Sequence, residues 1–221
     1  MTEPSVLELI TSARRPVFTT FELTALSGRS ASATTQALAR LARRGVLRKV
    51  RRGIWAVAGD QRASAFAVIP YLFPKDRAYV SFISALHLHG IVGQIPRVVT
   101  LASPAHSKTI VTSLGTFSVH RIAPVLFAGF RWYKDSGAFL IAEPEKALVD
   151  SLYLSARKKR QYGHFPELDF PRSFSFKKAR EWVERIPDGR IRKNVEGKLA
   201  AIAAKRKGQG GGRGHLRAPA L

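Results

Sequence analysis

The first part of the chain alternates short apolar stretches with polar residues that favour helix starts. Residues 5–13 place their apolar side chains at helical spacing, which predicts an amphipathic helix. Thr19 and Glu22 have the form of a capping box, because the threonine hydroxyl can accept from the amide three residues on while the glutamate reaches back. The helix that follows is expected to bury Leu23 and Leu26. The pattern thus predicts two consecutive helices near the N-terminus.

A third helix and a hairpin are expected next. Ser30 or Ser32 can cap the third helix, whose leucines fall on one face and whose small and polar residues fall on the other. The segments 46–51 and 54–57 predict two strands, and Gly53 supplies the backbone freedom that the turn between them needs. Three helices followed by a hairpin with arginines at its tip are typical of a winged helix-turn-helix domain.

The remainder of the chain mixes predicted strands and helices. The expected elements are a helix over 63–73 broken near Pro70, a helix over 79–88 that begins near Ser81, strands over 97–102, 109–113 and 116–122, a hairpin of 129–133 and 138–142, a helix opened by Pro144, and two helices over 176–186 and 192–205. The predicted fold class is therefore α+β: an N-terminal winged helix-turn-helix followed by a mixed α/β domain with a helical C-terminus.

These patterns divide the chain into three parts. Residues 1–60 are predicted to form the winged helix-turn-helix domain, and residues 61–204 the α+β domain. Residues 205–221 are predicted to be a basic, glycine-rich flexible tail. With 221 residues, 45% of them apolar, the chain is large enough to bury sizeable cores, which excludes disorder throughout.

The net charge of the chain indicates which class of partner it binds. The chain has 37 Lys and Arg against 15 Asp and Glu, a formal net charge of +22. The net charge is +7 over residues 1–58, +6 over 59–176 and +9 over 177–221, so both ends are denser in charge than the middle. Such an excess favours a nucleic-acid partner. A membrane surface is the weaker alternative, because no segment combines a basic face with a strong apolar face.

Composition also excludes several protein classes. The absence of cysteine excludes a disulfide scaffold and a zinc–cysteine site. The apolar stretch over 63–73 is too short to span a bilayer, and the N-terminus lacks the basic region of a signal peptide. We therefore expect a cytoplasmic protein without a membrane partner.

The predicted third helix and hairpin hold the candidate DNA-binding residues. When the residues of this helix are placed at steps of about 100° around its axis, the side chains on one face are small, polar and cationic. Small side chains let a helix enter the major groove, glutamine can bond adenine, and arginine can bond guanine or phosphate. An ordinary solvated face is the alternative for the helix taken alone. The candidates are Ser32, Gln36, Arg40 and Arg43 on the recognition helix and Arg48, Lys49, Arg51 and Arg52 on the wing.

The middle of the chain offers weak candidates for chemistry. His87 and His89 point about 200° apart on a helix, which suits no shared metal ion. Glu143 and Glu145 suit the positive end of the helix that follows, which is a structural role. An enzyme acting on nucleic acid, resting on these residues and Asp150, remains an alternative, but no phosphate-binding loop or nucleophile motif accompanies them. We expect no catalytic residue, metal or cofactor.

Several segments together carry a family resemblance. They are RRGVL at 43–47, RRGIW at 51–55, YVSFISALHLHGI at 79–91 with QIP at 94–96, and AEPEKALVD at 142–150. In this ordered set, which spans roughly residues 5–155, the chain resembles the antitoxins of AbiE-type abortive-infection systems, which are type IV toxin–antitoxin systems. The basic tail over 205–221 is a departure from the family pattern.

The resemblance implies a function for each domain. The winged helix, with its recognition helix at 32–44 and its wing at 48–55, would repress the operon by binding double-stranded DNA at promoter repeats. The second domain would counteract a nucleotidyltransferase-like toxin, with or without direct contact, and segment 143–150 would be structural. The alternative is a stand-alone winged-helix transcription factor whose second domain senses a ligand or forms dimers.

Overall fold

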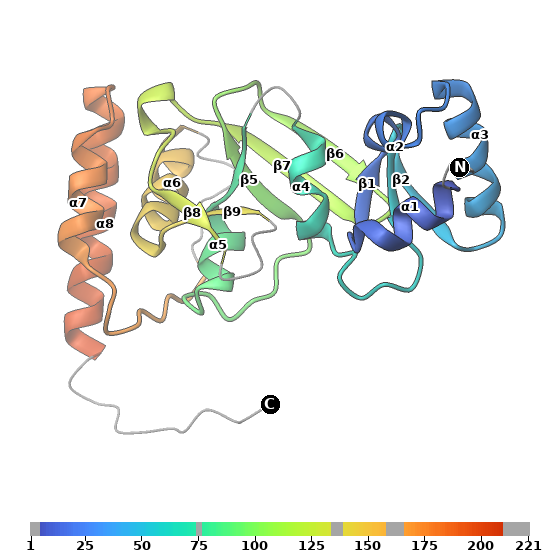
Figure 1. The fold of residues 1–221 in the computed structure, drawn as a ribbon. Helices are drawn as coiled ribbons and strands as arrows, with labels where there is room; N and C mark the ends of the chain where they lie inside the picture. The colour runs from blue at the N-terminus through green and yellow to red at the C-terminus, as the bar shows by residue number, and fades with distance from the viewer. Residues whose placement is uncertain (1–4, 74–76, 134–138, 158–165, 210–221) are drawn as a thin grey trace. The chain divides into compact units, whose positions relative to one another are not determined.

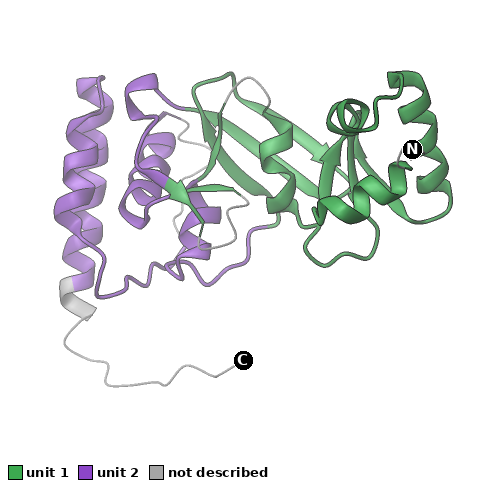
Figure 2. Cartoon of the chain, in the orientation of Figure 1, with its two compact units in different colours: residues 1–80, 97–121, 131–141 green, residues 81–96, 122–130, 142–221 purple. Residues whose placement is uncertain are grey.

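The computed structural model of the protein describes residues 5–73, 77–133, 139–157 and 166–209. Its segments form two compact units that interleave along the chain (Figure 1; Figure 2). Unit 1 comprises residues 1–80, 97–121 and 131–141, and unit 2 comprises residues 81–96, 122–130 and 142–221. The domain boundaries expected at residues 60 and 204 stay a prediction.

Unit 1 begins with the helices and strands of a winged helix. In chain order they are α1 (Val6–Ala13), β1 (Val17–Thr19), α2 (Thr20–Ser27), α3 (Ala31–Arg43), β2 (Leu47–Arg51) and β3 (Ile54–Val57). The three strands form an antiparallel sheet in the order β1-β3-β2. The predicted order of three helices and a hairpin is therefore confirmed, and β1 is an additional strand that the sequence pattern did not predict.

One apolar core holds this winged helix together. The core brings together residues of α1, α2 and α3 with residues of the sheet: Val6, Ile10, Phe18, Leu23, Leu38, Leu47 and Trp55, each at most 5% exposed. Phe18 of β1 and Trp55 of β3 are cross-strand partners, which places two aromatic rings at the centre of the sheet. The Trp55 indole also donates to the Thr20 hydroxyl at 2.9 Å, which ties β3 to the start of α2.

A second sheet has six strands in the order β6-β7-β5-β4-β9-β8. Strands β6 and β7 form an antiparallel hairpin, while β5 lies parallel to β7 and antiparallel to β4. The strands are β4 (Tyr79–Val80), β5 (Val99–Ser103), β6 (Lys108–Thr112), β7 (Gly115–Arg121), β8 (Phe130–Trp132) and β9 (Leu140–Ala142). Mixed pairing together with helices confirms the predicted α+β class. Residues 134–138, the expected turn between the last two strands, lie outside the described residues.

Unit 2 is built around helix α6. Its helices are α5 (Phe82–Leu88), the 3-10 turn η1 (Pro124–Leu126), α6 (Pro144–Arg157), α7 (Phe176–Glu184) and α8 (Gly189–Gln209). Helix α6 packs against α5, α7 and α8, and α7 and α8 lie side by side (Figure 1). Because α6 has neighbours on several sides, even its polar residues Glu145, Lys146 and Asp150 are buried.

Several expected details are corrected. Helix α4 (Ala65–Leu72) continues through Pro70 without the expected break, since a proline near a helix end removes only one backbone hydrogen bond. Residues 79–80 form strand β4, which was not expected, whereas the following helix starts at Phe82 after its N-cap Ser81, as expected. Leu26 is 60% exposed and not buried, because α2 turns that side away from the core. Helix α8 includes residues 205–209, which were assigned to the tail, and residues 210–221 lie outside the described residues.

Candidate nucleic-acid interface

Capping residues set where the two helices of the helix-turn-helix begin. The Thr19 hydroxyl accepts from the Glu22 amide at 3.1 Å, and the Glu22 carboxylate accepts from the Thr19 amide at 2.7 Å, which confirms the predicted capping box. Ser30, one of the two expected caps, starts α3 by accepting from the Ala33 amide at 3.2 Å. Between them Gly28 ends α2 with φ of +67°, in the left-handed region that glycine tolerates. The local sequence therefore determines where α3, the candidate recognition helix, begins.

Helix α3 separates an inner face from an outer face. Thr34 and Leu38 are fully buried against the core. At about 100° per residue, the outer face spans roughly 80° of the helix circumference. All four recognition-helix candidates lie within that arc and are exposed: Ser32, Gln36, Arg40 and Arg43. The structure thus brings them together on one solvent-facing surface, as contact with a groove would need.

The wing candidates divide between the two faces and the tip of the hairpin. Lys49 is the cross-strand partner of Trp55, and its ammonium lies 5.8 Å from the centre of the Trp55 ring. Arg48 is the partner of Ala56, so its side chain leaves the opposite face of β2. Arg51 and Arg52 are exposed at the tip. The four wing residues are therefore not one continuous surface.

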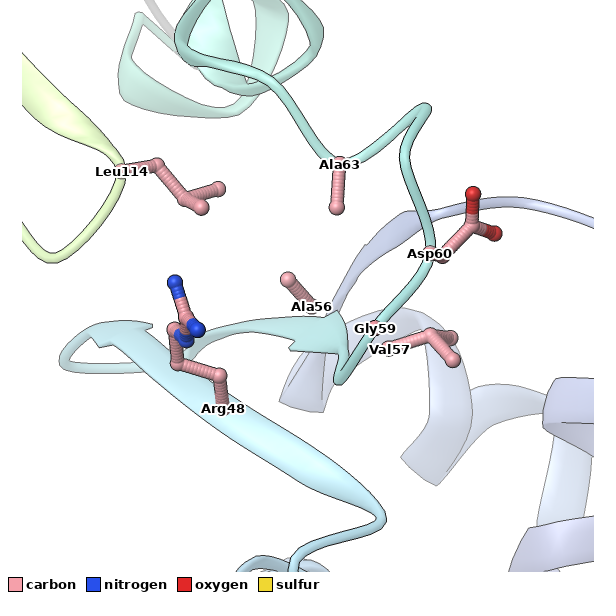
Figure 3. A pocket seen from close by; sticks show the side chains of 7 residues that line it. All are labelled: Arg48, Ala56, Val57, Gly59, Asp60, Ala63 and Leu114. Atoms are coloured by element: carbon pink, nitrogen blue, oxygen red, sulfur yellow. The ribbon is translucent and has the colours of Figure 1, made fainter.

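Arg48 borders a small hollow on the face of the winged-helix sheet that lies opposite Trp55 and the apolar core (Figure 3). Figure 3 shows its side chain and Leu114 of the β6–β7 turn extending into this hollow from two sides. The hollow has a volume of about 180 Å³, and its other lining residues are Ala56, Val57, Gly59, Asp60 and Ala63. Asp60 already pairs with Arg62 at 2.8 Å, and that guanidinium holds the pKa of Asp60 below its usual range.

The segment that contains α3 and the hairpin carries positive charges and no negative ones. Residues 23–59 contain no Asp or Glu. They contain eight cationic residues: Arg29, Arg40, Arg43, Arg44, Arg48, Lys49, Arg51 and Arg52. Three ion pairs occur among the residues that the structure describes, Arg15–Glu22, Arg62–Asp60 and Lys146–Asp150, and none involves these eight. Cations without carboxylate partners are available to bind phosphate groups.

Two of these cations were missed as candidates. Arg29 lies in the turn between α2 and α3, and Arg44 is the residue at which α3 ends. Both belong to the acid-free segment, and this absence of acidic residues is the sequence signal that could have identified them. Helix periodicity did not identify these two residues, because Arg29 lies before α3 and Arg44 lies at its C-terminal end.

The residues considered for enzymatic chemistry hold the fold of unit 2. The Asp150 carboxylate pairs with Lys146 and accepts from the Ser81 hydroxyl at 2.7 Å. Glu145 accepts from the backbone amide of Ser175 at 2.8 Å. The imidazoles of two histidines bond backbone carbonyls at different places, His87 that of Val92 at 3.0 Å and His89 that of Ala142 at 2.8 Å. Within the described ranges, no three His, Asp or Glu side chains gather as a metal site.

The helices of the structure were considered as possible membrane spans. Among the helices that the structure describes, none is both long and apolar enough to cross a bilayer.

Comparison with known proteins finds a family that the N-terminal segment resembles. Residues 7–58 match the sequence profile of a family described as a transcriptional regulator, AbiEi antitoxin. The matched segment runs from α1 to the end of the winged-helix hairpin, so it contains α3 and the hairpin, which are the candidate recognition helix and the candidate wing. The match confirms the expected resemblance over these residues. No curated protein matches the chain.

Proposed function

Since residues 7–58 match the AbiEi antitoxin transcriptional regulators, we propose that the chain is a DNA-binding repressor of its own operon. We propose further that it acts, in the cytoplasm, as the antitoxin of a type IV toxin–antitoxin system against a nucleotidyltransferase-like toxin. The proposal that the chain binds DNA rests on the exposed outer face of α3. This face lies within residues 23–59, which contain eight cationic residues and no acidic one. A polyanion is the ligand that this surface suits best.

In the proposed complex, α3 enters the major groove with its outer face. Gln36 can donate to and accept from adenine, and Arg40 can donate two bonds to guanine. Ser32 and Arg43 lie on the same face and contact bases or phosphates. These contacts would provide sequence preference, because base edges in the major groove present distinct patterns of donors and acceptors.

The wing supplies contacts that do not depend on sequence. Arg51 and Arg52 at the tip bind phosphates next to the groove. Arg48 and Lys49 remain in the proposed surface as weaker contributors, since Arg48 leaves the far face of β2 and Lys49 lies over Trp55. With base contacts assigned to α3 and phosphate contacts to the wing, we expect α3 to determine which DNA sequence is preferred. We expect the wing to determine how tightly DNA of any sequence is bound.

The test is a gel-shift titration over a salt series, with the upstream DNA of the gene and a shuffled fragment of equal length. We expect tight binding to the upstream fragment at near-physiological salt and a large preference over the shuffled one. Gln36→Ala or Arg40→Ala should reduce the preference by about 1–3 kcal/mol per base contact. Equal binding to both fragments that disappears as salt rises would contradict the repressor proposal.

The antitoxin part is tested by co-expression with the product of an adjacent nucleotidyltransferase-like reading frame. Rescue of growth by this chain supports the proposal. Specific DNA binding without such a gene, or without rescue, would instead favour a stand-alone transcription factor.

A further inference from the structure

The wing strand is held by a segment distant in the sequence. The turn between β6 and β7 approaches the free edge of β2 within unit 1. There the Ser113 hydroxyl donates to the carbonyl of Lys49 at 3.0 Å, and the Ser113 amide donates to the carbonyl of Val50 at 3.4 Å. One residue outside the winged helix therefore bonds two successive carbonyls of the wing strand.

These two carbonyls lie where the wing strand is irregular. In the β2–β3 ladder, Lys49 pairs with Trp55 and Arg51 with Ile54, so Val50 is an extra residue in a β-bulge. A bulge interrupts the ladder and changes the direction in which the next side chains point. Ser113 supplies one hydrogen-bond donor to each of the two carbonyls at this irregularity. The bulge directly precedes Arg51, so its geometry controls the direction of the tip.

The turn that carries Ser113 is itself fixed in place. The Thr112 hydroxyl donates to the Gly115 carbonyl at 2.8 Å and accepts from the Leu114 amide at 3.2 Å. Gly115 has φ of +149°, and a Cβ there would lie 3.1 Å from the Cβ of Ala65 in α4, so the turn packs tightly on this helix. A turn braced in this way can serve as a rigid support for a neighbouring strand.

We propose that Ser113 is a positioning residue for DNA binding, because it fixes the bulge that directs Arg51 and Arg52. The inference rests on the proposed DNA-binding function and extends it to a residue outside the segment that matches the family. Ser113 touches no DNA in this proposal. It reduces the freedom of the wing before binding, so that less conformational entropy is lost when the wing contacts phosphate.

The first experiment compares Ser113→Ala with Ser107→Ala in salt-series gel shifts. Ser107 is a matched control, because its hydroxyl accepts from the Arg121 amide at the opposite end of the same hairpin. Loss of one exposed hydrogen bond should weaken binding of Ser113→Ala by about two- to fivefold on upstream and shuffled DNA alike. Ser107→Ala should bind like wild type, and Ser113→Thr, which keeps a hydroxyl, should restore binding.

The second experiment repeats Ser113→Ala in a chain that already carries Arg51→Ala and Arg52→Ala. If Ser113 acts through the wing, the additional loss should disappear in this background. Amide hydrogen exchange without DNA gives an independent measure, and residues 50–54 should exchange faster in Ser113→Ala than in Ser107→Ala.

The outcomes separate this inference from the proposed function. A wild-type chain that binds upstream and shuffled DNA equally overturns the proposed repressor. A wild-type chain with specific binding overturns only this inference if Ser113→Ala binds like Ser107→Ala. A loss that persists without the two arginines also overturns it, as does unchanged exchange over residues 50–54.

Discussion

Lys146 and Asp150 lie one turn apart on α6, and both side chains are at most 1% exposed. Burial lowers the pKa of Lys146, whereas the nearby Asp150 carboxylate acts to raise it. The pair is further enclosed by the Ser81 hydroxyl on Asp150 and by the Trp182 ring, 5.4 Å from the Lys146 ammonium. A buried pair of this kind adds little stability over apolar residues of similar size, but breaking it leaves one uncompensated charge.

Asp150→Asn should therefore destabilise the protein by about 3–5 kcal/mol, because the buried ammonium loses its carboxylate. The double replacement Lys146→Met with Asp150→Leu should cost much less, since it removes both charges together. Urea unfolding followed by tryptophan fluorescence measures both changes. If Asp150→Asn unfolds at the same urea concentration as wild type, the pair has no structural role.

Residue spacing predicted the outer face of α3 correctly, and the reason is local. Hydrophobic period and capping residues decide which side of a helix faces the core, and both can be found in the sequence. The contrast between Arg48 and Lys49 could not be predicted in this way. It depends on the register of β2 against β3 and on the bulge at Val50, which only the paired strands define.

At the scale of elements, the start of α2 depends on its capping box. Thr19→Ala removes the hydroxyl that accepts from the Glu22 amide and should cost about 1 kcal/mol. Thr11→Ala is a suitable control, because Thr11 lies at an exposed position of α1 and its hydroxyl donates to the Leu7 carbonyl, and it should stay within about 0.5 kcal/mol of wild type. Thermal unfolding compares the two. Equal stability of both variants would show that the cap does not limit folding.

The wing makes a separate prediction about salt. Arg51→Ala with Arg52→Ala should weaken binding to every DNA sequence and reduce the slope of log affinity against log salt by up to about 0.9 per phosphate contact. Lys177→Ala with Lys178→Ala removes the same charge from exposed positions of α7 and should change the slope less. Gel shifts over a salt series measure both slopes. Equal slopes for the two pairs would mean that net charge alone, not the wing, determines the salt dependence.

Short strands mark the limit of what sequence predicts about elements. Strand β1 has three residues and β4 has two, too few for alternation to be recognised. Each is a strand because of a distant partner: β1 pairs with β3, and β4 with β5 and β9. Helices with capping residues were predicted more completely, because the bonds that start them join residues three apart.

At the scale of the whole molecule, the two compact units interleave instead of following one another. Strand β5 lies parallel to β7 although β6 intervenes, a topology that no local pattern specifies. The same long-range order brings Ser113 to the wing, 64 residues away from Lys49. A division of the chain at residue 60 describes the segment that matches the family, whereas the two hydrogen bonds from Ser113 to the wing strand come from beyond it.

The proposed functions should be separable in one variant. Arg51→Ala with Arg52→Ala changes two exposed side chains and leaves the cores and the α6 network intact, so the folded protein should persist. Repression, measured with a promoter reporter, should fall because the wing contacts are lost. Neutralisation of the toxin, measured as growth on co-expression, should remain, because the proposal assigns it to the second domain. Loss of neutralisation at equal protein level would show that antitoxicity needs the wing, and would contradict this division of function.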